Sequence, residues 1–265
     1  MKIGKTDGSI VVWEDNSIRK YPLIQNLMDI ILNPSILKSS RFEEITSPPE
    51  LELPIISHKI ICIAKNYEKH AKEMGVDPKI LPKTPSLFLK PSTTLIGPDD
   101  YIIFPSHSQE IHHEVELAVI IGKRGKNIPV EESLDYIFGY TILLDITARD
   151  IQALAKKNGQ PWFQAKGYDT FAPIGPLIVT PDEIKDPQNL ELELYVNKQL
   201  KQKGNTEEMI FDIKNIISYC SSIVTLEPGD IIATGTPEGV GPLNIGDEIE
   251  AIIEPIGVLK VRVRK

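Results

Sequence analysis

Two glutamates lie at the start of an apolar segment, where a carboxylate is unfavourable unless it has a partner. Glu114 and Glu116 open the segment that continues through residues 117–121. Residues two apart in a strand share a face, so both carboxylates point the same way, about 6.6 Å apart along the strand. Apolar neighbours on both faces indicate a buried strand, in which two anions need a cation. A strand end in solvent, where the pair needs no partner, is the alternative reading.

A third acid strengthens the first reading. Asp145 ends the apolar run 141–144, at a point where a strand gives way to a helix. Three carboxylates with open coordination positions suit Mg²⁺ or Mn²⁺, and Ca²⁺ can substitute for either. No spacing of histidines or cysteines here indicates zinc. We therefore predict that Glu114, Glu116 and Asp145 hold a divalent metal ion.

A histidine and a glutamate lie three residues apart on a predicted helix over residues 67–74. This spacing places His70 and Glu73 at neighbouring positions of one helix face. The carboxylate can orient the imidazole, and such a pair can remove a proton from water or from a carbon beside a carbonyl group. A solvated histidine and a solvated glutamate on a lysine-rich helix are the structural alternative.

Further polar side chains have weaker patterns. Lys166 lies in a loop among aromatic residues and can supply positive charge to a developing enolate. Arg149 and Gln152, three apart on a predicted helix over residues 147–157, can meet a substrate carboxylate. An ordinary surface lysine and an exposed helical pair explain these residues as well.

The glycine-rich segment 234–241 follows a predicted strand. It lacks both the Gly-Lys-Ser/Thr ending of a phosphate-binding loop and the dinucleotide fingerprint. Its backbone amides and threonine hydroxyls can hold a carboxylate, although a tight structural turn explains the segment too. His112 and His113 flank the acidic pair, and we expect both to be structural.

The elements that must position these residues are mostly strands. Helices, predicted over residues 67–74, 147–157 and 207–219, do not alternate regularly with the strands, so we predict a rolled, mostly β core of the α+β class. The predicted strands are Ile60–Ala64, Ser86–Lys90, Val115–Gly122, Tyr140–Leu144, Leu190–Val196, Ile231–Thr234, Glu248–Glu254 and Val258–Val263.

Residues 1–50 are predicted to form a small α/β module in front of a catalytic domain over residues 51–265. A hairpin with a turn at Asp7–Gly8, a second turn at residues 15–16 and a helix over residues 25–32 precede a stiff proline linker. Asn66 is a possible cap of the helix over residues 67–74. The module can act as a lid over the site.

Composition excludes several partners. The formal charge of −8 disfavours nucleic acid, which needs clustered basic residues, and no apolar stretch approaches the ~18 residues that cross a bilayer. The two cysteines have no metal-binding spacing, which fits a reducing, cytoplasmic setting. A small anionic substrate remains compatible with the negative charge if a metal ion lies between them.

Five segments occur in an order that resembles the fumarylacetoacetate hydrolase family, in its branch of acylpyruvases and 2-hydroxyhepta-2,4-diene-1,7-dioate isomerases. The resemblance covers roughly residues 55–265. The segments are Asn66-Tyr67 with His70-Ala71 and Glu73; Glu114 with Glu116-Leu117-Ala118; Asp145 with Thr147-Ala148-Arg149-Asp150 and Gln152; Lys166-Gly167-Tyr168-Asp169 with Pro173-Ile174-Gly175-Pro176; and Thr234-Gly235-Thr236-Pro237 with Gly239-Val240-Gly241.

This resemblance implies a mixed β-roll of the family's C-terminal domain type, usually dimeric. It implies that Glu114, Glu116 and Asp145 are metal ligands and that His70 with Glu73 is a water-activating pair beside a catalytic Lys166. The residues implied to bind substrate are Lys65, Tyr67, Arg149, Gln152 and Thr236. Lys65 departs from the arginine often found there; lysine keeps the charge but loses two-pronged recognition of a carboxylate, so we expect a different substrate or an altered binding geometry.

Our first functional hypothesis is a Mg²⁺-dependent hydrolase that breaks a carbon–carbon bond in acylpyruvates, or 2,4-diketo acids, through a pyruvate enolate held at the metal. Decarboxylation of oxaloacetate, or isomerisation of 2-hydroxymuconate-type acids, uses the same site without water as a reactant. A protein that binds metal and carboxylate without catalysis is the third hypothesis, against which His70 and Glu73 argue because binding alone needs no base.

Overall fold

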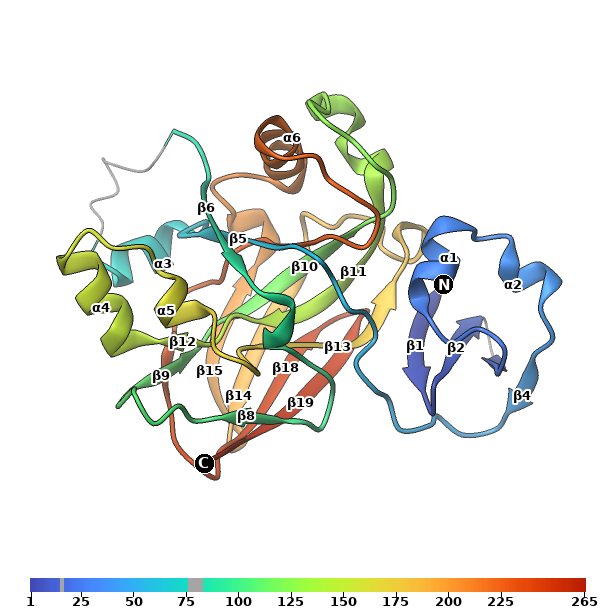
Figure 1. The fold of residues 1–265 in the computed structure, drawn as a ribbon, viewed down its shortest axis with the longest axis horizontal. Helices are drawn as coiled ribbons and strands as arrows, with labels where there is room; N and C mark the ends of the chain where they lie inside the picture. The colour runs from blue at the N-terminus through green and yellow to red at the C-terminus, as the bar shows by residue number, and fades with distance from the viewer. Residues whose placement is uncertain (15–16, 76–82) are drawn as a thin grey trace.

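The computed structural model describes residues 1–14, 17–75 and 83–265, and its chain is mostly β (Figure 1). The main sheet has eleven strands in the order β4-β3-β2-β1-β13-β11-β10-β16-β5-β6, with β7 paired to β13. Its strands are β1 Lys2–Thr6, β2 Ser9–Glu14, β3 Ser17–Tyr21, β4 Glu43–Ile45, β5 Ile60–Ala64, β6 Ser86–Lys90, β7 Leu95–Ile96, β10 Val115–Ile121, β11 Ile137–Leu144, β13 Ala172–Val179 and β16 Ile231–Ala233.

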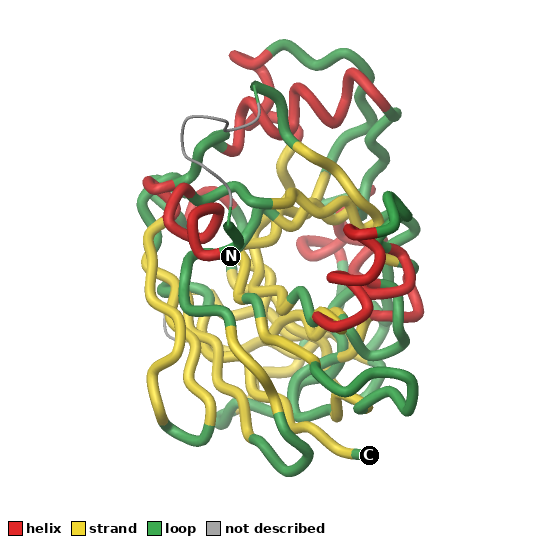
Figure 2. Tube along the Cα trace, turned by 90° about the vertical axis from the view of Figure 1, so that its left-hand side faces the viewer, coloured by secondary structure: helices red, strands yellow, loops and turns green. Residues whose placement is uncertain are grey.

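Two smaller sheets complete the roll. The order β15-β14-β18-β19-β8 joins β15 Gln199–Asn205, β14 Glu191–Val196, β18 Glu248–Ile253, β19 Gly257–Arg264 and β8 Tyr101–Ile103. The order β12-β9-β17 joins β12 Thr147–Ala148, β9 Ile111–His113 and β17 Gly241–Leu243. Figure 2 shows the strands running from the middle of the molecule to its lower left edge, with the helices grouped at the top and at the sides. The prediction of a mostly β, mixed roll of the α+β class is confirmed.

The helices are short. They are α1 Leu27–Leu32, α2 Ile36–Ser39, α3 Glu68–Glu73, α4 Arg149–Lys157, α5 Phe163–Lys166 and α6 Ile213–Ile223, with 3-10 turns η2 Ser92–Thr94, η3 Val130–Tyr136, η4 Pro181–Glu183 and η5 Thr206–Glu208. Figure 1 places α3, α4 and α5 together on one side of the main sheet, beyond the ends of β9 and β12. No helix in the ranges that the structure describes is long and apolar enough to cross a bilayer.

Strand β10 is the centre of the fold, and all of its residues are buried. Alternate side chains enter two different cores: Leu117 and Val119 pack with β14, β18 and β19, whereas Ala118 and Ile120 pack with β5, β16 and the N-terminal strands. Burial on both faces was predicted from the apolar run, and it is confirmed. The face that carries Ala118 and Ile120 also carries Glu116, because residues two apart share a face.

Residues 1–50 extend the main sheet. Strand β1 pairs with β13 in the register Lys2↔Val179 and Ile3↔Ile178, and β2 to β4 follow outward from it. The predicted hairpin is present, and its turn residues Asp7 and Gly8 have φ values of 43° and 65°, as a type I′ turn requires. The predicted turn at residues 15–16 lies outside the described residues. This N-terminal part lies at the right of Figure 1, on the side away from α3 to α5.

Three local predictions are wrong. The predicted helix over residues 207–219 is instead the turn η5 followed by α6, which begins only after the cap Asp212. The predicted helix over residues 147–157 begins at Arg149, because residues 147–148 pair with β9. Asn66 does not cap α3; its buried amide donates to the carbonyls of Phe211 and Thr234 and so joins two loops.

Candidate active site

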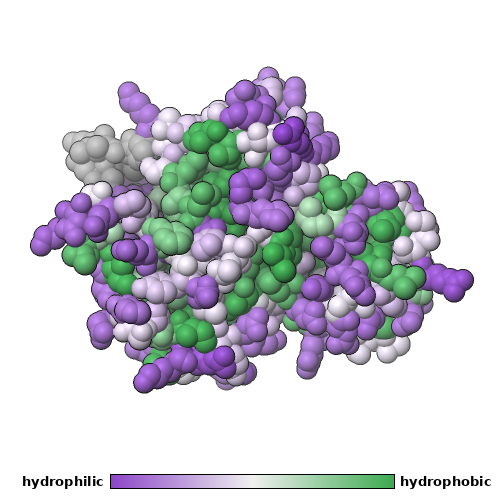
Figure 3. Space-filling model, viewed as in Figure 1, coloured by the Kyte–Doolittle hydropathy of each residue, from purple (hydrophilic) through white to green (hydrophobic). Residues whose placement is uncertain are grey.

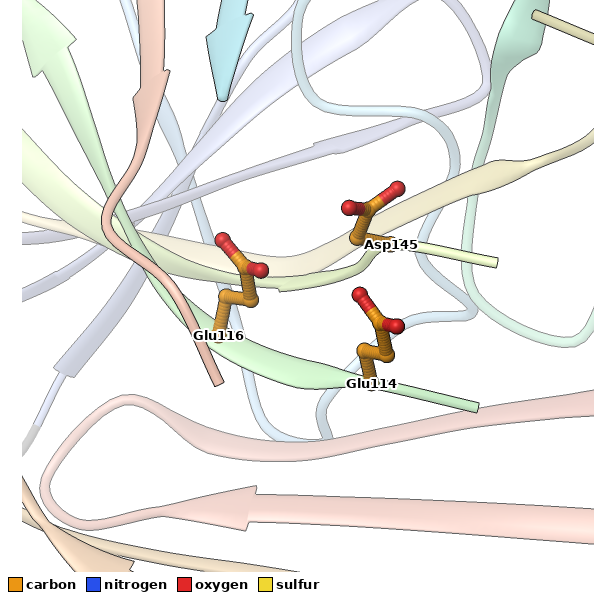
Figure 4. A group of neighbouring side chains, drawn as sticks. All are labelled: Glu114, Glu116 and Asp145. Atoms are coloured by element: carbon orange, nitrogen blue, oxygen red, sulfur yellow. The ribbon is translucent and has the colours of Figure 1, made fainter. Parts of the chain in front are cut away.

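The three predicted acids meet where β10 and β11 end. Glu114 lies between β9 and β10, Glu116 lies within β10, and Asp145 follows β11, whose register pairs Val115 with Leu144. The backbone N–H of Asp145 donates to the carbonyl of Glu114 at 2.9 Å, which fixes the two chain ends side by side. One oxygen of each acid lies within 4.8 Å of the others, and Figure 4 shows the three carboxylates directed into the same space.

These carboxylates are buried. Glu114 is 5% exposed, Glu116 2% and Asp145 1%, so the reading that placed the two glutamates at a solvated strand end is wrong. Buried anions this close repel one another strongly unless cations neutralise them. The structure places several cationic side chains beside these carboxylates.

Cationic side chains surround Glu114. Arg149 Nη2 donates to its Oε1, and Lys166 Nζ donates to its Oε2 at 2.8 Å. Burial by itself raises the pKa of Glu114, but the charges of Lys166, Arg149 and His70 outweigh it and hold that pKa well below its ordinary value. Glu114 is therefore ionised, and Arg149 is directed at it by α4 through a further hydrogen bond to Gln152 of 2.8 Å.

The environment of Glu116 has the opposite effect. Burial and the negative charges of Asp145 and Glu114 raise the pKa of Glu116 well above its ordinary value, and a hydrogen bond from the N–H of Gly235 at 2.8 Å offsets this only in part. Without a cation, this environment favours the protonated form of Glu116. A divalent cation among the three acids would displace that proton and stabilise the carboxylate.

Lys90, which the sequence prediction missed, is the most buried cation of the site. Its side chain is fully buried at the end of β6, and its Nζ donates to the carbonyls of Ile146, Lys166 and Phe171 at 3.1, 2.6 and 2.9 Å. The same Nζ lies 2.8 Å from Asp145 Oδ1. Three donors thus bind three carbonyls, and Asp145 receives charge without a directed hydrogen bond.

The residues present fit a divalent metal ion. Asp145 Oδ1 is a buried oxygen that accepts no hydrogen bond from the described residues, while Asp145 Oδ2 accepts from Lys166 at 2.5 Å. The Oδ1 oxygen is neutralised by the charge of Lys90 but accepts no directed hydrogen bond from the described residues, and a hard cation bound by oxygen ligands would satisfy it. Glu114, Glu116 and Asp145 would hold the ion, which supplies a Lewis acid at the floor of the cleft.

The predicted catalytic pair, His70 and Glu73, is in contact in the structure. His70 Nδ1 lies 3.1 Å from Glu73 Oε2, and the N–H of Gly239 donates to Glu73 Oε1 at 3.1 Å. Glu73 thus orients the ring from α3 and is itself held by the glycine-rich segment. His70 is buried, and its Nε2 is left for the cleft.

Nine of the eleven predicted site residues line one cleft of about 350 Å³, open solvent at its mouth included; they are Lys65, His70, Glu114, Glu116, Asp145, Arg149, Gln152, Lys166 and Thr236. Glu73 acts on it only through His70. Tyr67 is buried outside this cleft, in the wall of a separate groove with Pro237, so its role as a substrate ligand stays a prediction. All lining residues follow residue 62, and so the lid role of residues 1–50 also stays a prediction.

Lys156 is the second residue that the sequence prediction missed. It lies four residues after Gln152 on α4, lines the cleft, and has its Nζ 5.3 Å from the ring centre of Trp162. Burial, together with the positive charges of Lys65 and Arg149, lowers the pKa of Lys156 to about 8. Spacing on one helix face was the signal that could have found it.

An apolar groove adjoins the mouth of the cleft. It shares Lys65, Phe88 and Trp162 with the cleft wall, and its other side chains include the exposed Leu89 and Phe163. Figure 3 shows hydrophobic residues gathered on this face of the molecule over β6 and beside α6. The cleft therefore opens between a charged floor and an apolar rim.

Comparisons with known proteins agree with this geometry. The chain is 49% identical over 196 residues to oxaloacetate decarboxylase of Dictyostelium discoideum, which covers 72% of this chain and 87% of that protein. It is 46% identical over 207 residues to oxaloacetate tautomerase FAHD1 of Arabidopsis thaliana, covering 78% and 91%. The crystal structure of fumarylpyruvate hydrolase of Pseudomonas aeruginosa with Mn²⁺ and pyruvate is 33% identical, covers 83% of this chain and 94% of its own, and has a TM-score of 0.76.

The family model described as fumarylacetoacetate (FAA) hydrolase C-terminal matches residues 59–264. That range contains every acid, base and lysine of the cleft described above. The match therefore covers both the roll and the site, and the chain belongs to the fumarylacetoacetate hydrolase family.

Proposed function

We propose that this protein is a Mg²⁺- or Mn²⁺-dependent enzyme that acts at carbon 3 of small α-keto dicarboxylic acids such as oxaloacetate, by decarboxylation or by keto–enol conversion. The observation that carries the proposal is the buried cluster of Glu114, Glu116 and Asp145, in which one carboxylate oxygen accepts no hydrogen bond from the described residues, beside Lys166 and His70. Relatives at 49% and 46% identity, named for reactions of oxaloacetate, support this choice of substrate.

Glu114, Glu116 and Asp145 would hold a divalent ion, which would supply a Lewis acid for the oxygen of a 2-oxo group. Lys166, whose Nζ lies between Glu114 and Asp145, adds positive charge beside the same oxygen. In decarboxylation the C3–C4 bond breaks, carbon dioxide leaves, and the electron pair moves onto the 2-oxo oxygen. Carbon 3 of the resulting enolate then takes a proton from solvent, and the electron pair on the oxygen re-forms the 2-oxo group.

Keto–enol conversion needs a base in place of bond cleavage. His70 Nε2 removes a proton from carbon 3, and Glu73 holds the ring and balances its charge through Nδ1. The pair of electrons moves to the 2-oxo oxygen as before, and the protonated His70 can return the proton to carbon or leave it with oxygen. Both reactions thus use the same floor of the cleft.

Two cationic side chains in the cleft are available to bind the second carboxylate of the substrate. Arg149 and Lys166 are engaged with Glu114, whereas Lys65 and Lys156 line the cleft without an ion pair among the described residues. Two unpaired lysines at the mouth favour a substrate with a second negative charge. This preference is consistent with lysine in place of arginine at position 65.

Hydrolysis of acylpyruvates is the second candidate. The observation that favours it is the fixed orientation of His70: Glu73 is held by the N–H of Gly239 through one oxygen and contacts His70 Nδ1 through the other, which leaves Nε2 as the base that can act on water. Water attacks the 4-oxo carbon, the bond between carbons 3 and 4 breaks, and an acid and pyruvate are formed. The likeness to a fumarylpyruvate hydrolase structure supports this candidate.

Product analysis separates the candidates. The protein would be incubated with Mg²⁺ and oxaloacetate, or with a short panel of acylpyruvates, in wild type and in His70→Ala. Carbon dioxide release or enol decay from oxaloacetate, without acid release from acylpyruvates, is the expected result. Release of equimolar acid and pyruvate, lost in His70→Ala, would replace the first candidate with the second. No turnover of any compound would leave the metal- and carboxylate-binding hypothesis.

A further inference from the structure

A buried glutamine, Gln202, connects the floor of the cleft to the sheet behind it. Gln202 is the one buried residue of the otherwise polar β15, and it is 0% exposed. Its Nε2 donates to Thr236 Oγ1 at 2.8 Å and to the carbonyl of Pro237 at 3.0 Å. Its Oε1 accepts from the N–H of Val115 at 3.1 Å, between the two glutamates of the site.

The orientation of this amide is unambiguous. A backbone carbonyl such as that of Pro237 can only accept, and a backbone N–H such as that of Val115 can only donate. Gln202 therefore presents nitrogen to the loop and oxygen to β10. His113, whose Nδ1 lies 2.9 Å from Gln202 Oε1, must carry its proton on that nitrogen.

The glycine-rich segment 234–241 packs closely against β15. A Cβ at Gly239 would lie 2.2 Å from the carbonyl oxygen of Lys201, and one at Gly204 would lie 2.5 Å from Pro237 Cβ. Glycine at both positions allows the backbone of the glycine-rich segment to lie directly on the strand. This close contact brings Thr236 within reach of Gln202.

The consequence concerns the hydroxyl hydrogen of Thr236. Since Thr236 Oγ1 accepts from Gln202, its own O–H must point elsewhere, and no acceptor for it is found among the described residues. Thr236 is 2% exposed and lines the cleft with Glu116 and His70. A buried hydroxyl with an unused hydrogen is a donor prepared for a ligand.

We propose that Gln202 is a positioning residue that fixes the Thr236 hydroxyl as a hydrogen-bond donor to a carboxylate oxygen of the substrate. The inference rests on the proposed function, which supplies a keto acid as the ligand. Gln202 does not touch the substrate. Because Gln202 already donates to the Thr236 oxygen, Thr236 donates a hydrogen bond to the substrate and does not accept one from it. Selectivity for a carboxylate over an amide or hydroxyl donor follows at that position.

The test measures oxalate affinity in the presence of Mg²⁺ by calorimetry, and KM and kcat for a keto acid that the wild type converts. The variants are Gln202→Met, Thr236→Val, their combination, and Thr236→Ser, which keeps the hydroxyl. Gln188→Met is the matched control, because Gln188 also joins two backbone groups, Thr206 O and Ile213 N–H, but outside the cleft.

Gln202→Met is expected to weaken oxalate binding and raise KM by about tenfold, the scale of one charge-assisted hydrogen bond, with kcat changed much less. Gln202→Met should not change oxalate affinity or KM further in the Thr236→Val background, but it should have its full effect on both in the Thr236→Ser background. Gln188→Met should lower stability alone. Should Gln202→Met fail to fold, Gln202→Glu, which keeps the size and can accept the Thr236 hydrogen, replaces it with the same expectation.

Equal loss on Gln202→Met in the wild-type and Thr236→Val backgrounds would overturn the inference, since the glutamine would then act other than through Thr236. Oxalate binding that is absent in the wild type would overturn it too. Oxalate binding with the predicted coupling, but without turnover of any keto acid, would instead support the inference and count against the proposed enzyme.

Discussion

At the scale of single residues, the site is a balance of buried charges. The charges of Lys166 and Arg149 lower the pKa of Glu114, whereas burial and the charges of Asp145 and Glu114 raise the pKa of Glu116. The two glutamates share one strand face, but cations reach Glu114 and not Glu116 closely enough to outweigh burial. A metal ion changes that balance, because its charge exceeds that of any side chain present.

Metal binding should release a proton from Glu116. Because the folded pKa of Glu116 is raised, the proton competes with the ion below that pKa, and Mg²⁺ affinity should increase as pH rises through it. Calorimetry in buffers with different heats of ionisation measures the protons released per ion, and we expect a net release that decreases as pH rises through the pKa of Glu116. Binding without proton release, or affinity that is independent of pH, would show that Glu116 is already ionised.

Lys90 should be important to stability as well as to the site. In Lys90→Met, three buried carbonyls and Asp145 lose their cation, and we expect about 3–5 kcal/mol less stability, the usual cost of breaking a buried ion pair. Urea unfolding of the apoprotein measures it. Lys59→Met is the control, since Lys59 pairs with the buried Asp230 at 2.8 Å but is itself partly exposed, so it should cost less. Equal costs would show that burial of Lys90 adds nothing.

At the scale of elements, α4 presents one polar face to the cleft. Arg149, Gln152 and Lys156 follow at intervals of three and four, which is why a predicted helix over this segment was sufficient to group the first two. The helix also brings Lys156 beside Lys65, and their mutual repulsion contributes to the low pKa of Lys156.

The charge of Lys156 should control substrate affinity with pH. Its pKa of about 8 means that the ammonium is present below that pH and is lost above it, so KM for a dicarboxylic keto acid should rise above pH 8. Lys156→Met should raise KM about tenfold at neutral pH and flatten the rise, on the scale of one charged contact. Steady-state kinetics with a keto monocarboxylate is the comparison. An unchanged pH profile in Lys156→Met would assign the rise to another group.

What the sequence could predict follows from these elements. Strands β5 and β6 were predicted with their observed ends, since apolar runs and turn residues delimit them. Strand β13 was missed because prolines and a glycine interrupt it, and β15 because its residues are mostly polar and only Gln202 is buried. Lys90 looked like an ordinary strand end. Its burial depends on α5 and the loop at Phe171, which are distant in sequence, and no local pattern reports such contacts.

At the scale of the whole molecule, the N-terminal strands share a core with the catalytic sheet. Ile3 and Ile10 lie in the same apolar cluster as Ile60, Ala118 and Leu143. The predicted domain boundary near residue 50 can therefore be tested by the cooperativity of unfolding. A separate module would unfold by itself, whereas elements that share a core unfold as one unit.

Calorimetry of Ile10→Ala tests this. Ile10 is 0% exposed, and its truncation should cost about 2–5 kcal/mol. We expect one unfolding transition that moves as a whole to lower temperature, with kcat/KM unchanged at a temperature where the protein is folded. A split into two transitions, of which only one moves, would establish residues 1–50 as an independent domain. The homodimer expected from the resemblance is checked on the same samples by light scattering.

The central claim is that a divalent metal ion at Glu114, Glu116 and Asp145 drives chemistry on an α-keto acid. Its most direct test is the rate of oxaloacetate consumption as Mg²⁺ is added to metal-free protein, in wild type and in Glu116→Gln, which keeps the shape of the side chain and removes its charge. We predict a saturable rise from near zero in wild type and a rate reduced at least about a hundredfold in Glu116→Gln. Wild-type rates that are the same with EDTA, or a Glu116→Gln variant as active as wild type, would contradict the claim.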